Sequence, residues 1–202
     1  FNPFPYQIEL WKRLDELYEK GQGEIYVEKS RDIGITWAVL AWIFHKWLTI
    51  PGFTALIGSR KESEVDNKTI NSLFGKLRYF LYHMPHNFLL SSIRWKRKLH
   101  DNHMRLINPV NNSLIEGESS NPNFGRGKRA SVVFCDEVLF WPYIEESLSS
   151  LYDSAPIRIF VSTPTISDFA KRFVEDLRKQ GKVITLHWKV NPFKDEEWYK
   201  KE

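Results

Sequence analysis

The 202-residue sequence predicts an α/β fold of three layers, with a central, mostly parallel sheet. Segments with the period of a helix alternate with short apolar runs typical of buried strands along nearly the whole chain. The composition, 42% hydrophobic and 15% aromatic, is typical of a folded domain. Polar clusters follow three of the strand-like runs, at 29–36, 136–137 and 162–165. Because parallel strands end at one edge of a sheet, these clusters predict a ligand site there.

Composition also limits the class of protein. No apolar run approaches the roughly 20 residues that span a bilayer, so we expect neither a membrane segment nor secretion. The single cysteine, Cys135, excludes an internal disulfide and a thiolate-rich zinc site, and it fits a reducing compartment. The net charge of +4 permits a polyanionic partner without requiring one. The chain begins with Phe1 and shows no leader, so we expect a domain excised from a longer protein.

The elements of the first half follow from periodicity and turn residues. Apolar residues at helical spacing predict a first helix that Gly21 and Gly23 end. An alternating strand, a polar loop and a helix that is apolar on nearly all sides come next. Pro51-Gly52 then marks a turn before a second strand, and Pro85 ends a long helix. In order, these elements are the helix 6–20, the strand 24–29, the helix 36–48, the strand 53–59 and the helix 62–84.

The second half begins with strand-like alternation around an expected turn at Asp101-Asn102. A polar loop at 119–129 is rich in glycine, asparagine and arginine. Ser167 caps the last long helix, and Gly181 ends it. In order, the elements are two strands within 93–108, the strand 113–119, the strand 131–137, the helix 143–153, the strand 157–162, the helix 168–180 and the strand 182–188.

The stretch KSRDIGIT has the form of a phosphate-binding loop that lacks the usual lysine. The usual pattern, G-x-x-x-x-G-K-[ST], places lysine before the final hydroxyl residue, where this chain has Ile35. Gly34 and Thr36 are in place, and the Thr36 hydroxyl could bind Mg²⁺. Lys29 and Arg31 are two candidates for the missing charge, and the alternative is an ordinary strand-to-helix connection. The candidate nucleotide-binding residues are Lys29, Ser30, Arg31, Asp32, Ile33, Gly34, Ile35 and Thr36.

Two adjacent carboxylates, Asp136 and Glu137, directly follow the buried run VVFC. Placing them there is costly unless a cation awaits them. In a nucleotide hydrolase, Asp136 would hold Mg²⁺ and Glu137 would act as the general base. The alternative is a helix N-terminus with acids that the helix dipole favours. The loop about a hundred residues upstream favours the catalytic interpretation.

The run Ser162-Thr163-Pro164-Thr165 places hydroxyl groups at the end of another strand. There they would lie beside the acidic pair and could sense whether a γ-phosphate is present. A strand-ending turn that caps the next helix explains the same residues equally well.

Together the three clusters resemble the ATPase domain of the large terminase subunit, the DNA-packaging motor of tailed bacteriophages and their relatives. The resemblance runs from PFPYQIELW to NPFKDEEWY, almost the whole chain. It implies a P-loop NTPase fold of the ASCE or RecA-like kind. KSRDIGIT resembles the family's deviant Walker A motif, with the lysine moved to Lys29 at the start of the loop and Arg31 as a loop arginine that takes part in catalysis.

The remaining motifs follow the same resemblance. VVFCDE resembles Walker B with Glu137 as its catalytic glutamate, and VSTPT resembles the coupling motif, with Ser162, Thr163 and Pro164. The YQ step resembles the adenine motif, so Tyr6 would stack on the base and Gln7 would bind its edge.

The loop NPNFGRGKRAS contains an Arg-Gly step of the kind that family members use as an arginine finger on a neighbouring subunit. Arg126 matches that step, and Arg129 is the weaker alternative. Because the chain holds one nucleotide-binding core, a finger must act in cis or come from another subunit. A solvated basic loop is the structural alternative. The basic runs at 94–98 and Arg60-Lys61 could contact DNA phosphates, although such runs are usually only solvated.

The resemblance implies an ATPase that uses Mg²⁺ with ATP and powers the translocation of double-stranded viral DNA into a procapsid. Its implied partners are a homo-oligomeric ring of this chain, the portal protein and the small terminase subunit, in the host cytoplasm. Residues 1–190 would be the motor domain, and 191–202 would begin a linker toward a nuclease domain, so we expect no nuclease activity here. Two alternatives stay open: another helicase-like, DNA-dependent ATPase, and a degenerate nucleotide-binding assembly switch, which Ile35 favours and the intact Asp136-Glu137 pair disfavours.

Overall fold

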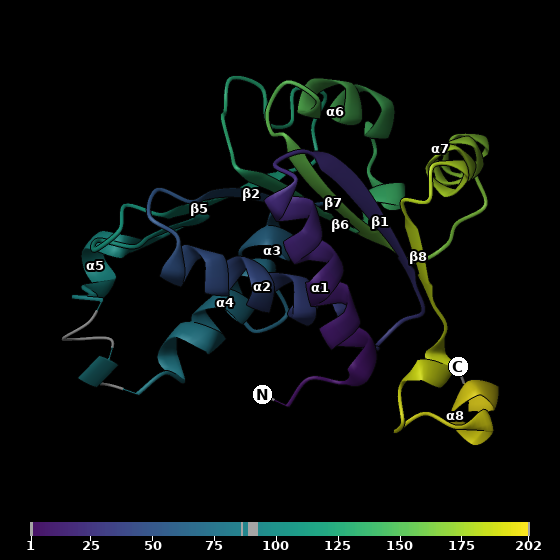
Figure 1. The fold of residues 1–202 in the computed structure, drawn as a ribbon, viewed down its shortest axis with the longest axis horizontal. Helices are drawn as coiled ribbons and strands as arrows, with labels where there is room; N and C mark the ends of the chain where they lie inside the picture. Colours follow the sequence, from purple (N-terminus) through teal and green to yellow (C-terminus); the bar gives the residue numbers. More distant parts are fainter. Residues whose placement is uncertain (1, 86, 89–92, 202) are drawn as a thin grey trace.

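The computed structural model describes residues 2–85, 87–88 and 93–201, and it confirms the three-layered α/β fold (Figure 1). Within those residues, a sheet of eight strands in the order β3-β4-β5-β2-β6-β7-β1-β8 lies between two layers of helices. The strands are β1 (Gly23–Lys29), β2 (Thr54–Ser59), β3 (Asp101–Asn102), β4 (Arg105–Ile107), β5 (Leu114–Ser119), β6 (Val132–Asp136), β7 (Ile157–Ser162) and β8 (Val183–Leu186). The helices are α1 (Pro5–Glu19), α2 (Ile35–Thr49), α3 (Glu62–Val65), α4 (Leu73–Tyr82), α5 (Arg97–His100), α6 (Ile144–Leu151), α7 (Asp168–Lys179) and α8 (Glu196–Lys201), with 3-10 turns η2 (Val138–Phe140) and η3 (Trp188–Val190).

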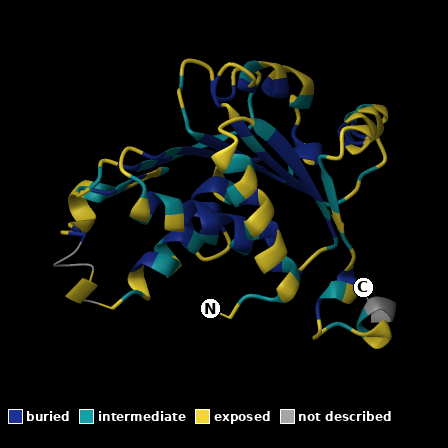
Figure 2. Ribbon diagram, viewed as in Figure 1, coloured by how far each residue is buried: buried dark blue, intermediate teal, exposed yellow. Residues whose placement is uncertain are grey.

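The sheet is parallel except at the β3-β4-β5 end, which is antiparallel. Helices α1, α2 and α4 cover one face, and α6 and α7 cover the other (Figure 1). Strand β6 shows why both faces bury apolar residues (Figure 2): Val132 and Phe134 belong to the core under α2, whereas Val133 and Cys135 belong to the core under α6. Because β1, β6 and β7 are parallel neighbours, their carboxyl ends meet at one edge.

The predicted helix over 62–84 is wrong, because the segment forms two helices, α3 and α4, joined by a turn at 66–72. Side chains in the turn bind nearby backbone N–H groups in place of helical carbonyl groups. Asp66 accepts from Lys68, Asn67 accepts from Thr69, and Ser72 caps α4 by accepting from Gly75.

The segment 93–108 also differs from the prediction. Residues 97–100 form the short helix α5, and the expected turn at Asp101-Asn102 is instead strand β3, paired with β4. The chain turns two residues later, at His103 and Met104, where Met104 has a φ of 52°. The Asp101 carboxylate accepts a hydrogen bond from Arg78, which holds this residue in the strand.

Beyond β8, the chain passes through η3 and ends in α8, close to the start of α1 (Figure 1). Phe193 packs edge-on against Phe4, with ring centroids 5.8 Å apart. The boundary expected at residue 190 stays a prediction. Every helix in the described part of the chain is too short or too polar to cross a bilayer.

Candidate active site

The loop between β1 and α2 has the backbone of an anion site. Gly34 precedes α2 with a φ of 72°, and no side chain caps the helix. The first N–H groups of α2 are therefore left for a ligand. The position needs glycine for its backbone angle, and a Cβ there, 2.8 Å from Gln7 Nε2, would also displace the Gln7 amide.

Four successive carbonyl oxygens of this loop accept hydrogen bonds from side chains near the two ends of the chain. The pairs are Lys194 Nζ to Arg31 O (2.8 Å), Asn191 Nδ2 to Asp32 O (3.4 Å), Tyr6 Oη to Ile33 O (2.7 Å) and Gln7 Nε2 to Gly34 O (3.2 Å). In a planar trans peptide, the N–H of the next residue points opposite to the carbonyl. The N–H groups of residues 32–35 are therefore directed away from these side chains, as a phosphate-binding loop requires.

Tyr6 and Gln7 thus lie against the loop, as expected for residues that belong to a nucleotide site. Gln7 is buried, and its Oε1 also accepts a hydrogen bond from Phe4 N at 3.0 Å. Both polar atoms of the amide already have protein partners. The binding of a base by Tyr6 and Gln7 stays a prediction.

Lys29 and Glu137 form a buried ion pair that joins two of the sequence clusters. Lys29 is the last residue of β1 and is 8% exposed. Its Nζ lies 2.7 Å from Glu137 Oε1, across the end of β7, which separates β1 from β6. The structure therefore places the charge of Lys29, one of the two candidates, at the centre of the site. Arg31, the other candidate, is exposed on the rim of the same site.

Glu137 also binds the predicted coupling residues. Its Oε2 accepts hydrogen bonds from Thr163 N (3.2 Å), Thr163 Oγ1 (3.3 Å) and Ser162 Oγ (3.4 Å). The expected contact between the hydroxyl row and the acidic pair is confirmed, whereas Pro164 points into a separate cavity beside α7. Glu137 has a φ of 50°, an uncommon backbone conformation for a residue other than glycine.

The pKa of Glu137 reflects these contacts. Burial raises the pKa, but the charge and hydrogen bond of Lys29, with the hydrogen bonds from Thr163, outweigh burial and lower it overall. A carboxylate held in this way is a weak base. Without Lys29 beside it, the same carboxylate would be a stronger base.

Thr36 and Asp136, the expected Mg²⁺ ligands, are in direct contact. Thr36 Oγ1 donates to Asp136 Oδ1 at 2.9 Å. Burial, aided by the charge of Glu137, raises the pKa of Asp136 to about 6, although Lys29 and Thr36 act in the opposite direction. Mg²⁺ in phosphate sites commonly takes one or two protein oxygen ligands and completes its shell with phosphate oxygens and water. A buried carboxylate beside a hydroxyl fits that pattern.

The residue at the usual lysine position, Ile35, has an apolar side chain and cannot supply the charge. Its side chain is 1% exposed and belongs to the core under α2.

Two adjoining cavities lie around Lys29 and Glu137. One, of about 460 Å³, reaches Gly34, Thr36 and Lys76, and the other, of about 320 Å³, reaches Arg31 and Arg60.

Arg60, predicted as a possible DNA contact, therefore lies at the candidate active site. Its guanidinium binds both carboxylate oxygens of Glu64, and it lies 5.9 Å from the ring centroid of Phe140. In the other basic run, at 94–98, Arg94, Lys96, Arg97 and Lys98 are exposed, and nothing in the structure tests a DNA contact.

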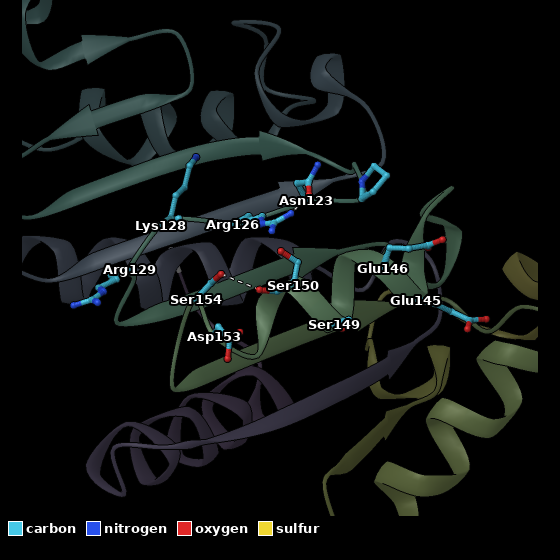
Figure 3. A pocket seen from close by; sticks show the side chains of 12 residues that line it. Asn123, Arg126, Lys128, Arg129, Glu145, Glu146, Ser149, Ser150, Asp153 and Ser154 are labelled. Carbon is cyan, nitrogen blue, oxygen red and sulfur yellow. Dashed lines mark hydrogen bonds between the residues drawn. The ribbon is translucent and has the colours of Figure 1, made fainter.

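Arg126 is exposed on a different surface, between Gly125 and Gly127, whose φ angles are 74° and 77°. Its Nη1 donates to Asn123 Oδ1 at 2.9 Å. Figure 3 shows Arg126 across a cavity of about 920 Å³ from α6 and the turn after it. Arg126 lines neither cavity around Lys29. Arg129 lines the same 920 Å³ cavity as Arg126 and is likewise absent from the lining of the other two.

Three residues at the site carried no signal in the sequence. Lys76 reaches the site from α4, and Asn191 and Lys194 reach it from the segment after β8. Their contacts depend on how distant elements pack, so no local motif could have indicated them.

No protein-family model matches this chain, and no curated protein matches it. Solved structures share its fold. The ATPase domain of the large terminase of Thermus phage P74-26 aligns with a TM-score of 0.64 and 18% identity, over 100% of this chain and 87% of that domain. The large terminase of bacteriophage HK97 aligns with a TM-score of 0.63 and 13% identity, over 96% of this chain and 41% of that one.

The large terminase of a thermophilic bacteriophage, solved in complex with ATP-gamma-S, aligns with a TM-score of 0.63 and 12% identity. The alignment covers 98% of this chain and 48% of that one, so this chain spans about half the length of the full terminases. At these identities the similarity establishes the fold. The expected resemblance to large terminase ATPase domains, and the P-loop fold that it implies, are confirmed at that level.

Proposed function

We propose that this chain is an ATPase motor domain that hydrolyses ATP with Mg²⁺ to drive double-stranded viral DNA into a procapsid. The observation that carries the proposal is the pair of contacts Thr36–Asp136 and Lys29–Glu137. They join the loop to the acidic strand end across about a hundred residues, in the arrangement that a P-loop ATPase needs. The shared fold supports the same reading, because one structure with this fold contains ATP-gamma-S.

The side chains divide the chemistry among them. The N–H groups of residues 32–35 and the ammonium of Lys29 would bind the phosphates. Mg²⁺, held by Thr36 and Asp136, would neutralise charge on the phosphate oxygens. When Lys29 turns from Glu137 to the phosphates, the Glu137 carboxylate becomes free to accept a proton from the attacking water. Thr163, at the end of β7, donates hydrogen bonds to the same carboxylate, so its contacts would change when Glu137 changes partner.

The working assembly belongs to the proposal as well. Arg126 is exposed and lines neither cavity around Lys29, which supports a finger that acts on a neighbouring subunit. A homo-oligomeric ring on a portal protein, with a small terminase subunit and DNA, in the host cytoplasm, is the setting in which such a finger would function. Arg31, on the rim of the site, would help to stabilise the transferring phosphoryl group.

The test is ATP turnover per molecule, measured against protein concentration, with Glu137→Gln as the blank. We expect turnover that the substitution abolishes and that rises with concentration, because a finger in trans needs assembly. Turnover that stays flat with concentration would place the activating cation in cis.

Tight ATP binding without turnover at any concentration would contradict the motor. It would favour the assembly switch. The observation that favours a switch is the Lys29–Glu137 ion pair, because Lys29 binds the carboxylate that would serve as the base.

A further inference from the structure

The cations around the candidate site are not equally free to bind a phosphate. Lys29 is paired with Glu137, and Arg60 is paired with Glu64. A cation that exchanges a carboxylate for a phosphate gains less binding free energy than an unpaired cation does, because its ion pair with the carboxylate has to be broken first. A cation without a carboxylate partner can therefore bind a phosphate without first giving up an ion pair.

Lys76, in the second turn of α4, is such a cation. It lines the 460 Å³ cavity together with Gly34, Thr36 and Glu137. Its Nζ donates to the carbonyl of Asn71 at 3.0 Å and lies 5.8 Å from the ring centroid of Trp37. Among the described residues, no carboxylate lies within ion-pair distance of this ammonium. Burial lowers the pKa of Lys76, and the charge of Asp136 offsets part of that effect.

The start of α4 fixes the direction of this side chain. Ser72 caps the helix through Gly75 N, and a Cβ on Gly75 would lie 1.6 Å from the Thr69 carbonyl oxygen. The turn at 66–72 therefore packs tightly against the first turn of α4, and α4 itself packs on α2. This packing presents Lys76 to the amino end of α2, where Ile35 has displaced the usual lysine.

We propose that Lys76 is a catalytic-site cation that binds the terminal phosphates of the nucleotide, and that it replaces, from α4, the charge missing at position 35. The inference rests on the proposed ATPase function. It goes beyond that function in assigning the phosphate charge to two lysines, Lys29 and Lys76. A charge-assisted hydrogen bond of this kind changes affinity by roughly 10- to 100-fold.

The experiment compares Lys76→Met, Lys76→Arg and the exposed control Lys179→Met, each as the full chain and each checked for an unchanged melting temperature. Binding of ATP, ADP and AMP is measured with turnover. We expect Lys76→Met to weaken ATP binding about 10- to 100-fold and to leave AMP binding unchanged. Lys76→Arg should restore most of the affinity, and Lys179→Met should behave as the wild type.

A second measurement does not depend on any variant. Amine-reactive labelling of the wild-type chain, read by mass spectrometry, should slow at Lys76 when ATP-gamma-S is present and should not change at Lys179. If the wild type binds and hydrolyses ATP while Lys76→Met matches it within about twofold, the inference is overturned and the ATPase proposal stands. Labelling of Lys76 that ATP-gamma-S does not slow would also overturn it. A wild type that binds no ATP would overturn both proposals.

Discussion

At the scale of single residues, one buried lysine, Lys29, lies beside both the acidic strand end and the loop before α2. Lys29 lies at the end of β1, where the strand directs its side chain across β7 to Glu137. Arg31, two residues on, has left the strand and is exposed. The structure therefore separates the two candidates for the positive charge of the loop by position: Lys29 is buried and paired with Glu137, and Arg31 is exposed on the rim of the site.

We expect Lys29→Met to abolish detectable turnover and to weaken ATP binding by about 10- to 100-fold, because it removes the phosphate contact. Arg31→Met should reduce turnover while changing ATP affinity by less than about tenfold, because an exposed cation is screened by solvent. Fluorescence titration and steady-state turnover separate the two effects. Equal losses of affinity in both variants would show that the charge is shared.

The sequence predicted which polar clusters would lie together where each cluster belongs to one strand end. The acidic strand end, the glycine and hydroxyl of the loop, and the hydroxyl row after β7 each follow their own strand, and the parallel sheet brings them together. The position of Lys76 at the site could not be predicted, because it depends on how α4 packs on α2. An amphipathic helix with a lysine beside its apolar face is common and indicates no particular site.

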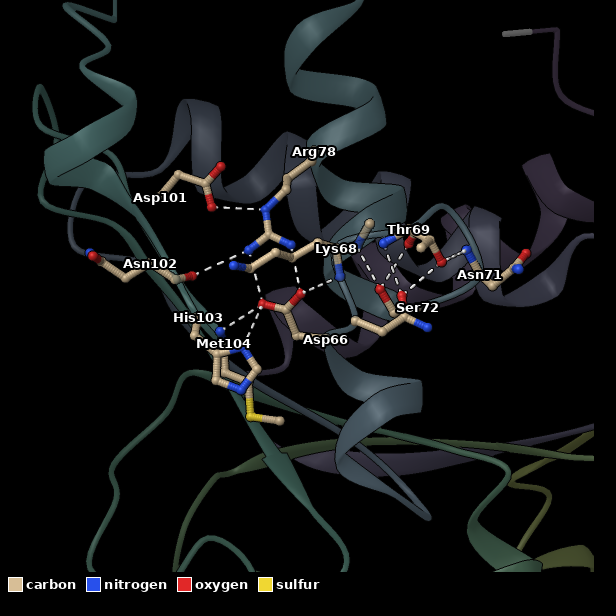
Figure 4. Close-up of polar contacts among 12 residues, drawn as sticks. Asp66, Lys68, Thr69, Asn71, Ser72, Arg78, Asp101, Asn102, His103 and Met104 are labelled. Carbon is tan, nitrogen blue, oxygen red and sulfur yellow. Dashed lines mark hydrogen bonds and ion pairs between the residues drawn. The ribbon is translucent and has the colours of Figure 1, made fainter.

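At the scale of elements, a buried ionic cluster fixes the part of the chain that carries α4. Arg78, on α4, binds both oxygens of Asp66 at 2.7 and 2.9 Å and Asp101, at the start of β3, at 2.8 Å (Figure 4). Asp66 also accepts hydrogen bonds from Lys68 N and Met104 N. The cluster therefore joins the turn before α4 to the β3–β4 hairpin, and it holds α4 in the position that presents Lys76.

This cluster predicts a pH dependence of stability. Burial raises the pKa of Asp66, but Arg78 and the N–H groups of Met104 and Lys68 outweigh it, so the folded pKa lies below its ordinary value. A carboxyl group with a depressed pKa stabilises the fold above its unfolded pKa, about 3.9, and loses that contribution as the pH falls through the folded value. We expect Asp66→Asn to cost about 2 kcal/mol at pH 7 and progressively less below about pH 4.

Urea unfolding of both proteins between pH 7 and pH 3 measures the difference. Asp176→Asn, at an exposed carboxylate, is the matched control and should change stability by less than about 0.5 kcal/mol at any pH. A cost of Asp66→Asn that stayed constant down to pH 3 would show that the loss comes from packing and not from the charge.

The same cluster shows why the elements in this region were mispredicted. Periodicity alone extends a helix through Asp66, Asn67 and Ser72, because the flanking residues keep helical spacing. The turn forms because these side chains bind backbone groups, and Asp66 does so together with an arginine twelve residues later and a hairpin further on. A local sequence pattern cannot indicate such tertiary partners. By contrast, α7 has its capping serine and terminal glycine within the local sequence, and it lies where the sequence predicts it.

At the scale of the whole molecule, the candidate catalytic residues and Arg126 occupy different surfaces of one chain. The Arg126 loop is held in place by its own contacts: Phe124 is buried and packs on Trp141, and Glu118 accepts a hydrogen bond from Gly125 N. A loop that is fixed but exposes its arginine is suited to docking against a second copy. If Arg126 is a finger in trans, each subunit holds an incomplete site that its neighbour completes.

A mixing experiment tests this arrangement directly. Arg126→Ala subunits keep Lys29 and Glu137 but lack the finger, and Glu137→Gln subunits keep the finger but lack the base. Each variant alone should lose about 10³-fold or more of turnover. In a randomly mixed closed ring of equal parts, roughly a quarter of the sites combine an intact base with a neighbour's finger, so the mixture should recover a comparable share of wild-type turnover.

Arg129→Ala mixed in the same way shows whether the neighbouring arginine serves instead. A mixture that stays as inactive as its components, at concentrations where wild-type turnover per molecule has reached its plateau, would contradict a finger in trans. Arg126→Ala subunits that keep wild-type turnover on their own would leave Arg31 and Arg60, on the rim of the site, to supply the activating cation.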